Sequence, residues 1–308
     1  MKAAATPRTV GGWWQEVTRR LRRAGLVFGH GTSNARDEAA WLLCHAVRLP
    51  FDDLEGALDR PVDAAAARRI EALAARRIAT RAPLAYLLRE AWLQGHRFYV
   101  DRRTIVPRSH IAALLPAGLS PWLGTRPPRR ILDLCTGSGC LAILAALAFP
   151  RARVDASDVS AAALAVARKN VASYRLGRRV RLVRSDLFAA LGKTPYDLLL
   201  CNPPYVPRND MRRLPPEYRH EPALALASGE DGLDFVRRLL AEVRGRLTDD
   251  GLLVGEIGEG RRVVERAFPD TTLTWLTTAA GTGLVFLATA ADLPKCAAVQ
   301  ERRRNGDG

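Results

Sequence analysis

The sequence predicts an α/β protein, with a mostly parallel sheet whose last strand runs antiparallel and with a helical domain before it. Three observations carry this prediction. The first 90 residues place apolar side chains at helical spacing and contain no strand pattern. From residue 131 onward, short apolar runs alternate with helical segments, as in a parallel sheet. A glycine-containing turn joins the first of these runs to a helix, which is typical of the nucleotide-binding half of a doubly wound fold.

The composition is that of a globular protein with a strongly basic charge. The chain has 308 residues, enough for one large domain and a small one, and its formal net charge is +15. Arginine carries nearly all of the positive charge, because lysine occurs only at positions 2, 169, 193 and 295. Arginine pairs well with phosphate, so such a surface favours nucleic acid or a ribonucleoprotein neighbour. A compositional drift toward arginine is the alternative, and the sequence does not choose between the two.

The cysteine spacing and the apolar runs exclude several classes of protein. The five cysteines show no zinc-binding spacing, so we expect free thiols in a reducing cytosol and no metal site. The first residues lack an apolar core long enough for a signal peptide, and no uninterrupted apolar run could span a membrane. We therefore expect a cytoplasmic protein with no membrane partner.

Residues 1–90 are predicted to form the helical domain. Trp13, Val17 and Leu21 lie at near-helical spacing. Ser33 and Asn34 are both suited to cap a second helix, and Asp63 is suited to open a third. A basic helical domain ahead of a catalytic one suits recognition of a macromolecular substrate. Packing or dimerisation with solvated arginines is the alternative.

The rest of the chain divides into three parts. Residues 91–125 combine an alternating apolar pattern, which predicts a hairpin, with a linker. Residues 126–290 contain the strands and helices of the predicted sheet, including a helix over 233–247 and a strand over 251–256. Residues 291–308 end in a charged run and are predicted to be a disordered tail.

The turn after the first strand has the features of a cofactor site. The residues of the turn are Cys135, Thr136, Gly137, Ser138 and Gly139. Gly137 and Gly139 let the backbone approach a ligand, because neither carries a Cβ. Asp133 precedes the turn, and the spacing differs from the Gly-x-Gly-x-x-Gly of a dinucleotide site. The second strand ends at Asp158, where a carboxylate accepts hydrogen bonds from ribose hydroxyls in dinucleotide-binding folds.

A second group of polar residues follows the fourth strand. The apolar run Tyr196–Leu200 leads into Cys201-Asn202-Pro203-Pro204-Tyr205. The two prolines end the strand, since neither can donate to a ladder, and they hold Asn202 in an extended conformation. Ligands bind at this carboxyl edge in open α/β sheets. The loop presents an amide, backbone carbonyls and an aromatic ring but no base, which suits an amide or amine substrate.

The Asn-Pro-Pro-Tyr motif after a hydrophobic strand resembles the amino-methyltransferase motif of class I S-adenosylmethionine-dependent enzymes. Adenine methyltransferases acting on DNA and protein glutamine methyltransferases both carry it. Residues 29–32, 95–101, 133–140 and 218–222 are similar to the glutamine methyltransferase that acts on the third protein of the large ribosomal subunit. The sister family, which methylates peptide release factors, has glycine where this chain has Cys135. His110 and the arginine-rich tail are local departures from the family pattern.

The resemblance implies a Rossmann-like class I methyltransferase sheet and S-adenosyl-L-methionine as the cofactor. The residues implied to bind the cofactor are Asp133, Cys135, Thr136, Gly137, Ser138, Gly139, Asp158, Asp186, Leu187 and Asn202. The residues implied to be catalytic are Asn202, Pro203, Pro204 and Tyr205. Asp186 would accept the adenine amino group.

The implied reaction is methyl transfer to the side-chain amide nitrogen of a glutamine in that ribosomal protein, free or within an assembling ribosomal particle. The arginine-rich surface would then contact ribosomal RNA. Two other acceptors stay open at this point. One is the Gly-Gly-Gln glutamine of peptide release factors, and the other is an adenine amino group in nucleic acid.

Overall fold

The computed structural model describes residues 8–123, 126–258, 260–278 and 281–294. The chain divides into two compact units. Residues 1–91 and 214–220 form one, called here the helical unit, and residues 92–213 and 221–308 form the other, called the sheet unit. Most of the predicted tail, from residue 295 onward, lies outside the described residues.

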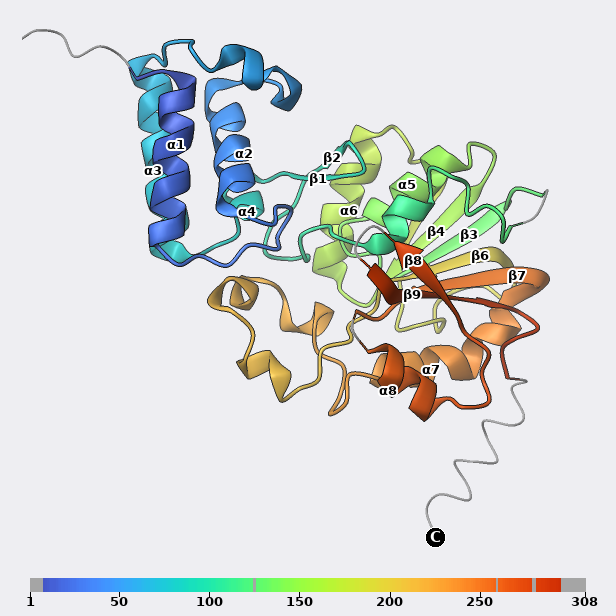
Figure 1. The fold of residues 1–308 in the computed structure, drawn as a ribbon. Helices are drawn as coiled ribbons and strands as arrows, with labels where there is room; N and C mark the ends of the chain where they lie inside the picture. The colour runs from blue at the N-terminus through green and yellow to red at the C-terminus, as the bar shows by residue number, and fades with distance from the viewer. Residues whose placement is uncertain (1–7, 124–125, 259, 279–280, 295–308) are drawn as a thin grey trace, which may run out of the picture. The chain divides into compact units, whose positions relative to one another are not determined.

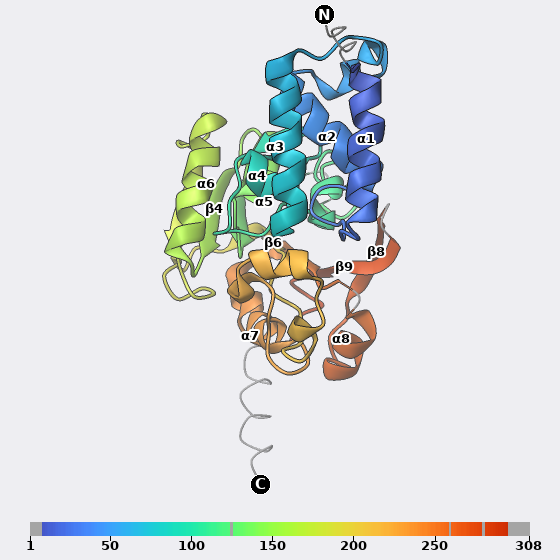
Figure 2. The ribbon, with the colours of Figure 1, turned by 90° about the vertical axis from the view of Figure 1, so that its left-hand side faces the viewer.

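The helical unit is built from four α-helices, as the apolar spacing predicts (Figures 1 and 2). They are α1 (Val10–Arg23), α2 (Ala35–Val47), α3 (Ala64–Thr80) and α4 (Leu84–Leu88), with the short 3-10 turns η1 (Phe51–Asp53) and η2 (Glu55–Ala57) between α2 and α3. Asn34 accepts hydrogen bonds from two backbone N–H groups at the start of α2, and Asp63 accepts one at the start of α3, so both predicted caps are confirmed.

Buried ion pairs fix the segment 214–220 within the helical unit. Arg77 on α3 is buried and donates to Glu38 on α2, with Nε 2.8 Å from Oε1. Glu217, also buried, lies 2.7 Å from Arg81 and accepts a hydrogen bond from the Val27 backbone N–H at 3.1 Å. Removing one partner of such a buried pair costs roughly 3–5 kcal/mol, because the other charge is left uncompensated.

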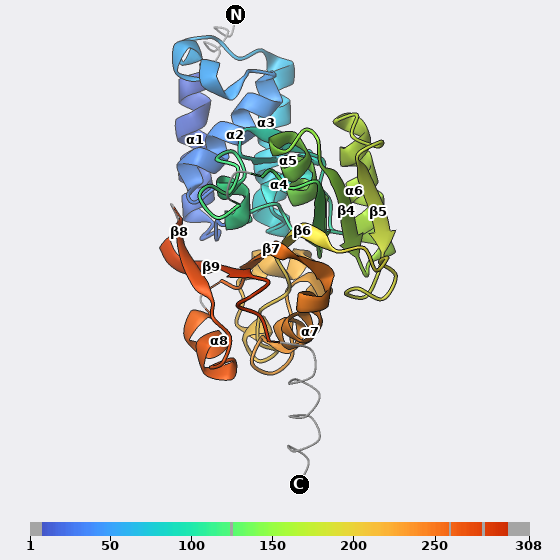
Figure 3. The same cartoon turned by 90° about the vertical axis from the view of Figure 1, so that its right-hand side faces the viewer.

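The sheet unit contains a seven-stranded sheet in the order β5-β4-β3-β6-β7-β9-β8 (Figures 1 and 3). Its strands are β3 (Arg130–Leu134), β4 (Arg153–Asp158), β5 (Val180–Arg184), β6 (Tyr196–Cys201), β7 (Leu247–Glu256), β8 (Thr274–Thr278) and β9 (Gly281–Thr289). Neighbouring strands from β5 to β7 are parallel, and β9 runs antiparallel to β7 and β8. The predicted mostly parallel sheet with an antiparallel last strand is therefore confirmed.

Helices cover both faces of this sheet, as in a doubly wound fold (Figures 1 and 3). On one face, α5 (Cys140–Ala148) and α6 (Ala161–Ser173) pack with η3 (His110–Leu114) over Ile131, Leu198 and Val254. On the other, α7 (Asp234–Glu242) and α8 (Arg261–Ala267) pack over the alternate residues Leu132, Leu199 and Leu253. Both faces are buried, which explains why these strands are continuous apolar runs.

Two elements differ from the sequence prediction, and a hairpin agrees with it. The helix expected over 233–247 ends at Glu242 and continues as the 3-10 turn η7 (Val243–Arg246), where Gly245 weakens helix formation. β7 begins at Leu247 instead of Gly251, because Leu247 pairs with Tyr196 before a bulge. The predicted hairpin consists of β1 (Ala91–Leu93) and β2 (His96–Phe98). Within the described ranges, no helix is long and apolar enough to cross a membrane.

Candidate active site

The parallel register brings the predicted site residues to one edge of the sheet. Leu134 at the end of β3 is level with Ser157 of β4 and with Cys201 of β6, and Cys201 is level with Gly255 of β7. The segments that follow these strands therefore leave the sheet side by side, and they carry both the glycine turn and the Asn-Pro-Pro-Tyr motif. This is the carboxyl edge, where ligands bind in open α/β sheets.

Asp133, which precedes the glycine turn, is buried, and only one of its two carboxylate oxygens is hydrogen-bonded within the described residues. Its Oδ2 accepts hydrogen bonds from Thr136 Oγ1 at 2.5 Å and from the Ala142 backbone N–H at 3.0 Å. Its Oδ1 has no hydrogen-bond partner among the residues that the structure describes. Burial raises the pKa of this carboxyl to about 7. An unpartnered buried carboxylate oxygen is costly, so Oδ1 is suited to accept from a ligand.

The turn itself forms an open backbone cradle. The Thr136 N–H donates to the Ser157 carbonyl at 2.9 Å, which ties the turn to β4. Gly137 has φ +55, and a Cβ there would meet only a backbone oxygen 3.9 Å away. Gly139 has φ +81, and a Cβ there would lie 3.2 Å from the Cβ of Ala167 on α6. Glycine at 137 thus leaves room for a ligand, and glycine at 139 allows the close approach of α5 to α6.

Cys135 occupies a backbone conformation that favours glycine. Its φ is +57, in the left-handed region, where a residue with a Cβ is strained by roughly 1–2 kcal/mol. The Cys201 thiol beside it, together with burial, raises the pKa of the Cys135 thiol well above its ordinary value. Cys135 is therefore a neutral wall of the turn and not a reactive nucleophile.

Asp158 connects the end of β4 to the glycine turn. Its Oδ2 accepts from the Gly137 N–H at 2.9 Å, and its Oδ1 accepts from the Ser160 N–H at 2.8 Å. Burial raises the pKa of this carboxyl, against the effect of these two bonds. Each oxygen keeps a second lone pair, so the predicted contact with ribose hydroxyls stays available and stays a prediction.

Asp186 differs from Asp133 and Asp158 in its exposure to solvent and in its pairing with an arginine. Asp186 follows β5, is exposed, and lies 2.9 Å from Arg238 of α7. Leu187, with φ +47, and Phe188 are buried in the core on the α7 face. The predicted adenine contacts of Asp186 and Leu187 stay predictions, and an adenine at Asp186 would share this carboxylate with Arg238.

The Asn-Pro-Pro-Tyr loop presents two free hydrogen-bonding groups. The Asn202 side chain is half-buried, and no hydrogen bond reaches its amide from the described part of the chain. The backbone carbonyl of Pro203 likewise accepts none from the described residues. Pro203 is buried and Pro204 is half-buried, so the backbone of the loop is rigid. These two acceptors have fixed positions near the glycine turn, so they are suited to accept hydrogen bonds from the two N–H groups of a primary amide or amine.

Two glycines that the sequence prediction missed shape this loop. Gly232 has φ +83, and a Cβ there would lie 2.4 Å from the Tyr205 carbonyl oxygen. Gly258 has φ +55, and a Cβ there would lie 2.8 Å from the Tyr205 ring. Gly232 thus makes room for the backbone carbonyl of Tyr205, and Gly258 makes room for its ring. The isolated glycines are visible in the sequence, but their contacts with Tyr205 are long-range and leave no local pattern.

The long loop after the motif is closed by backbone hydrogen bonds. The Val206 N–H donates to the Leu226 carbonyl at 2.8 Å, and the Ser228 N–H donates to the Val206 carbonyl at 3.0 Å. The Arg208 N–H donates to the Gly229 carbonyl at 2.8 Å. These bonds fix the position of the chain immediately after Tyr205, so the motif is held at both ends.

Two buried glutamates hold the segment that precedes η3. Glu221 accepts two hydrogen bonds from the Arg108 guanidinium, at 2.6 and 2.7 Å, and one from the Val106 N–H at 2.9 Å. Glu256, the last residue of β7, accepts from Ser109 Oγ at 2.6 Å and from the His110 N–H at 2.8 Å. Burial raises the pKa of Glu256 against these bonds. Sequence reasoning singled out residues 218–222 by their similarity to the family but did not assign these pairs.

Asn170 on α6 is another residue that sequence reasoning missed. Its Nδ2 donates to the Ser138 carbonyl at 2.8 Å and to the Tyr99 carbonyl at 3.0 Å, and its Oδ1 accepts from the Tyr99 N–H at 2.7 Å. The buried Asn170 therefore ties the glycine turn to the segment that follows the hairpin. An asparagine inside a helix, where its intrinsic propensity is poor, was the available signal.

These features fit S-adenosylmethionine. The free Oδ1 of Asp133 can accept a hydrogen bond from the amino group of the cofactor. The open turn at Gly137 has room for the amino acid end of the cofactor, and Asp158 lies beside the turn, where it can accept from the ribose hydroxyls. In the described residues, no cluster of three or more His, Cys, Asp or Glu side chains could hold a metal ion.

Comparison with known proteins gives matches along most of the chain. Residues 118–214 match the family model of the methyltransferase small domain, and residues 13–88 match that of the PrmC N-terminal domain. A ribosomal protein uL3 glutamine methyltransferase of Bordetella pertussis is 54% identical over 277 residues, which are 89% of this chain and 92% of that protein. The protein of the same name from Burkholderia pseudomallei is 50% identical over 96% of this chain and 100% of its own length. The chain belongs to the family of ribosomal protein uL3 glutamine methyltransferases.

Membership of the uL3 glutamine methyltransferase family confirms the resemblance seen in the sequence. A further member, from Bradyrhizobium diazoefficiens, is 49% identical over 281 residues, 89% of this chain and 88% of that protein. The methyltransferase family model covers β3, α5, β4, α6, β5 and β6, the elements that carry the glycine turn, Asp158 and Asn202. The glycine turn, Asp158 and the Asn-Pro-Pro-Tyr loop thus lie within the part of the chain that matches a methyltransferase model.

Proposed function

We propose that the protein transfers a methyl group from S-adenosylmethionine to the side-chain amide nitrogen of a glutamine in ribosomal protein uL3. The observation that carries this proposal is the pair of free acceptors at the end of β6, the Asn202 amide and the Pro203 carbonyl. The acceptor protein is proposed from the printed names of relatives that are 49–54% identical.

The Asn-Pro-Pro-Tyr loop acts by orienting the acceptor amide. An amide nitrogen is a poor nucleophile, because its lone pair is delocalised into the carbonyl group. Asn202 Oδ1 accepts one N–H of the glutamine amide and the Pro203 carbonyl accepts the other, so the lone pair is directed toward the methyl group. The same two acceptors stabilise the positive charge that develops on the nitrogen.

S-adenosylmethionine, when bound, supplies the methyl group in an activated form. The residues proposed to hold it are Asp133, Cys135, Thr136, Gly137, Ser138, Gly139, Asp158, Asp186 and Leu187, whereas Asn202 is assigned to the acceptor amide. Alignment of the two reacting centres contributes several kcal/mol, up to roughly 7–11 in the best cases. The Tyr205 ring, which packs against Gly258, forms a wall of the acceptor site. After the bond between sulfur and the methyl carbon breaks and the bond to nitrogen forms, the extra proton on nitrogen passes to water.

The parts of the chain outside the methyltransferase domain are proposed to recognise the substrate. The basic helical domain, residues 1–90, would bind the ribosomal protein, and residues 91–125 would join it to the catalytic domain at 126–290. The substrate would be uL3 as free protein or within an assembling ribosomal particle, and the reaction would take place in the cytoplasm.

Methyl transfer to purified proteins tests the proposal. The enzyme is incubated with isotopically labelled S-adenosylmethionine and with either uL3 or a peptide release factor, and the labelled peptides are mapped by mass spectrometry. We expect the label on one glutamine of uL3 and a much slower rate with the release factor. Equal rates on the two proteins would overturn the choice of acceptor, and label on adenine in added nucleic acid would overturn the amide chemistry.

A further inference from the structure

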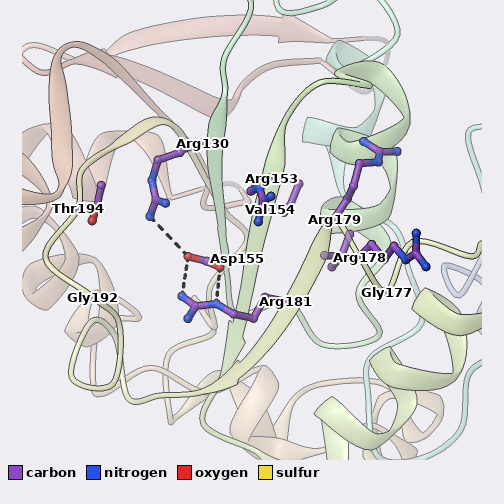
Figure 4. A pocket seen from close by; sticks show the side chains of 11 residues that line it. Arg130, Arg153, Val154, Asp155, Gly177, Arg178, Arg179, Arg181, Gly192 and Thr194 are labelled. Carbon is purple, nitrogen blue, oxygen red and sulfur yellow. Dashed lines mark hydrogen bonds and ion pairs between the residues drawn. The ribbon is translucent and has the colours of Figure 1, made fainter.

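A hollow lies at the edge of the sheet opposite the glycine turn. Its volume is about 380 Å³, and it is formed by the amino-terminal ends of β3, β4 and β5 with the segments around Gly177 and Gly192 (Figure 4). β4 runs from Arg153 in this hollow to Asp158 at the carboxyl edge. Five steps of about 3.3 Å separate the two, so the hollow lies roughly 16 Å from the cofactor turn.

The hollow is lined mainly by arginine. The arginines are Arg130, Arg153, Arg178, Arg179 and Arg181, and Asp155 is the one acid among the lining residues. Five guanidinium groups and one carboxylate leave a net charge of +4. Such a concentration of one sign in a concave site attracts anions from solution.

Some of these arginines are already occupied by the protein. Arg181 forms two hydrogen bonds with Asp155, at 2.7 and 2.9 Å, and Arg130 lies 3.9 Å from the same carboxylate (Figure 4). Arg179 donates to the Ala146 carbonyl at 2.7 Å, which leaves its charge unpaired. Asp155 therefore fixes the rim at Arg181 and Arg130 without neutralising the whole cluster.

Arg153 and Arg178 are the free members of the cluster. Both are exposed, and within the described residues neither side chain has a hydrogen-bond or ion-pair partner. An arginine that folding does not use can give all five of its N–H donors to a ligand, and the planar guanidinium matches a phosphate through paired hydrogen bonds.

The sheet arranges the arginines in a row. Arg130 of β3 is level with Arg153 of β4, and the Val154 N–H donates to the Arg179 carbonyl across the β4–β5 boundary. Adjacent strands are about 4.8 Å apart, so the charges repeat across the strands and do not converge on one point. A row of cations suits a linear polyanion better than a single small anion.

We propose that this hollow binds the phosphate backbone of RNA. The inference rests on the proposed function for the source of the RNA, which would be ribosomal RNA that accompanies the substrate protein. The hollow lies at the opposite edge of the sheet from the Asn-Pro-Pro-Tyr loop, so it does not dock the glutamine that is methylated. The hollow instead holds the RNA of the particle while the opposite edge of the sheet holds the glutamine.

The test compares two double variants of the full chain. Arg153→Gln with Arg178→Gln removes the free members of the cluster, and Arg68→Gln with Arg76→Gln removes the same charge from exposed positions of α3. Binding to a fluorescein-labelled 20-base-pair RNA duplex is followed by anisotropy across a range of salt concentrations. Thermal unfolding of each variant checks that it folds.

We expect the hollow variant to bind the duplex roughly tenfold more weakly at 0.1 M salt, and the control variant less than twofold more weakly. Two lost phosphate contacts lower the slope of log affinity against log salt by about 1.8, at about 0.9 each. An equal loss in both variants, or an unchanged slope in the hollow variant, would overturn the inference.

Two competitors identify the anion. Inorganic phosphate at 10 mM and a polyglutamate peptide are added to the protein–RNA complex at constant ionic strength. Displacement of RNA by phosphate would mean a small-anion site, and tighter binding of polyglutamate than of RNA would mean a protein ligand; either result overturns the RNA assignment. We expect neither competitor to displace the duplex.

Methyl transfer to free uL3 separates this inference from the proposed function. The hollow variant should methylate the free protein at the wild-type rate, because neither arginine belongs to the catalytic edge. If wild-type protein fails to methylate uL3, the proposed function fails whatever the RNA result. If methylation proceeds but the RNA affinity does not change when Arg153 and Arg178 are replaced, only the inference fails.

Discussion

Asp158 accepts a hydrogen bond from the backbone N–H of Gly137, with 2.9 Å between Oδ2 and N. The carboxylate at the end of β4 therefore fixes the turn that follows β3, in addition to its proposed contact with ribose. The two roles of this side chain predict that one substitution affects both the shape of the turn and the binding of the cofactor.

Asp158→Ala should lose most of the affinity for S-adenosylmethionine while the fold survives. The change removes acceptors for the Gly137 and Ser160 N–H groups, which costs stability on the order of 1–3 kcal/mol. Calorimetric titration and urea unfolding measure the two effects. Asp158→Asn, which keeps one acceptor oxygen, is the control and should lose less stability. Unchanged cofactor affinity in Asp158→Ala would contradict the ribose assignment.

Asp133 should make the protein without cofactor less stable as the pH rises from 5 to 8. Its folded-state pKa of about 7 lies above the unfolded value of about 3.9, so the folded state binds a proton that the unfolded state lacks in this window. The free energy of unfolding therefore falls with pH until the folded carboxyl ionises. The loss between pH 5 and pH 8 is on the order of 2–3 kcal/mol.

Urea unfolding of wild type and Asp133→Asn at both pH values measures this contribution of Asp133. Asparagine does not titrate, so the variant should lack this part of the pH dependence. Subtracting the pH dependence of the variant's free energy of unfolding from that of wild type removes the contributions of groups that titrate in both proteins. A wild-type slope equal to that of the variant would show that Asp133 does not titrate in this range.

Asn202→Ala should abolish turnover and leave cofactor binding nearly intact. The proposed cofactor contacts come mainly from β3, β4 and β5, whereas the free Asn202 amide is assigned to the acceptor. Loss of one preorganised hydrogen-bond partner costs roughly 2.7–4 kcal/mol, about a hundred- to a thousandfold in rate. Single-turnover transfer with saturating cofactor measures the rate.

Asn202→Asp should also fail although it keeps an acceptor oxygen, because its negative charge would lie close to the carboxylate of the bound cofactor and would disturb the Pro203–Pro204 turn. The cofactor dissociation constant is determined for both variants in parallel. Strongly weakened cofactor binding with a normal single-turnover rate would make Asn202 a cofactor ligand and not a residue of the acceptor site.

Gly232→Ala should slow methyl transfer although residue 232 does not belong to the motif. The added Cβ would lie 2.4 Å from the Tyr205 carbonyl oxygen, so the loop must move. A displacement near 1 Å costs about a hundredfold in rate when it misplaces reacting groups. Gly245→Ala, where no atom lies within 4 Å of the added Cβ, is the matched control and should leave the rate unchanged. Equal rates in the two variants would show that Tyr205 is not held by this contact.

The local parts of the fold and site could be predicted from the sequence. Periodic apolar residues and caps predict α1, α2 and α3, and the strand–turn–helix pattern predicts β3, the glycine turn and α5. These elements depend on neighbours in the chain. Asp133 and Asp158 were found for the same reason, because each one ends a recognisable strand.

The supporting contacts could not be predicted, because they join residues far apart in sequence. Glu256 and Ser109 are separated by 147 positions, and Glu221 and Arg108 by 113. Nothing in the local pattern of either pair indicates its partner. Asp186 shows the same limit, since its strand end was visible but its pairing with Arg238 of α7 was not. Long-range pairing thus decides which of the edge acids are free.

The buried Glu217 has a consequence for how the chain can be divided. Residues 214–220 belong to the helical unit, although they lie between two stretches of the sheet unit in the sequence. A shortened protein that begins at residue 92 would keep Glu217 but lose Arg77, Arg81 and the Val27 N–H. The chain cannot therefore be cut near residue 91 to give an autonomous enzyme. Grafting this methyltransferase onto another recognition module requires replacing the 214–220 segment as well.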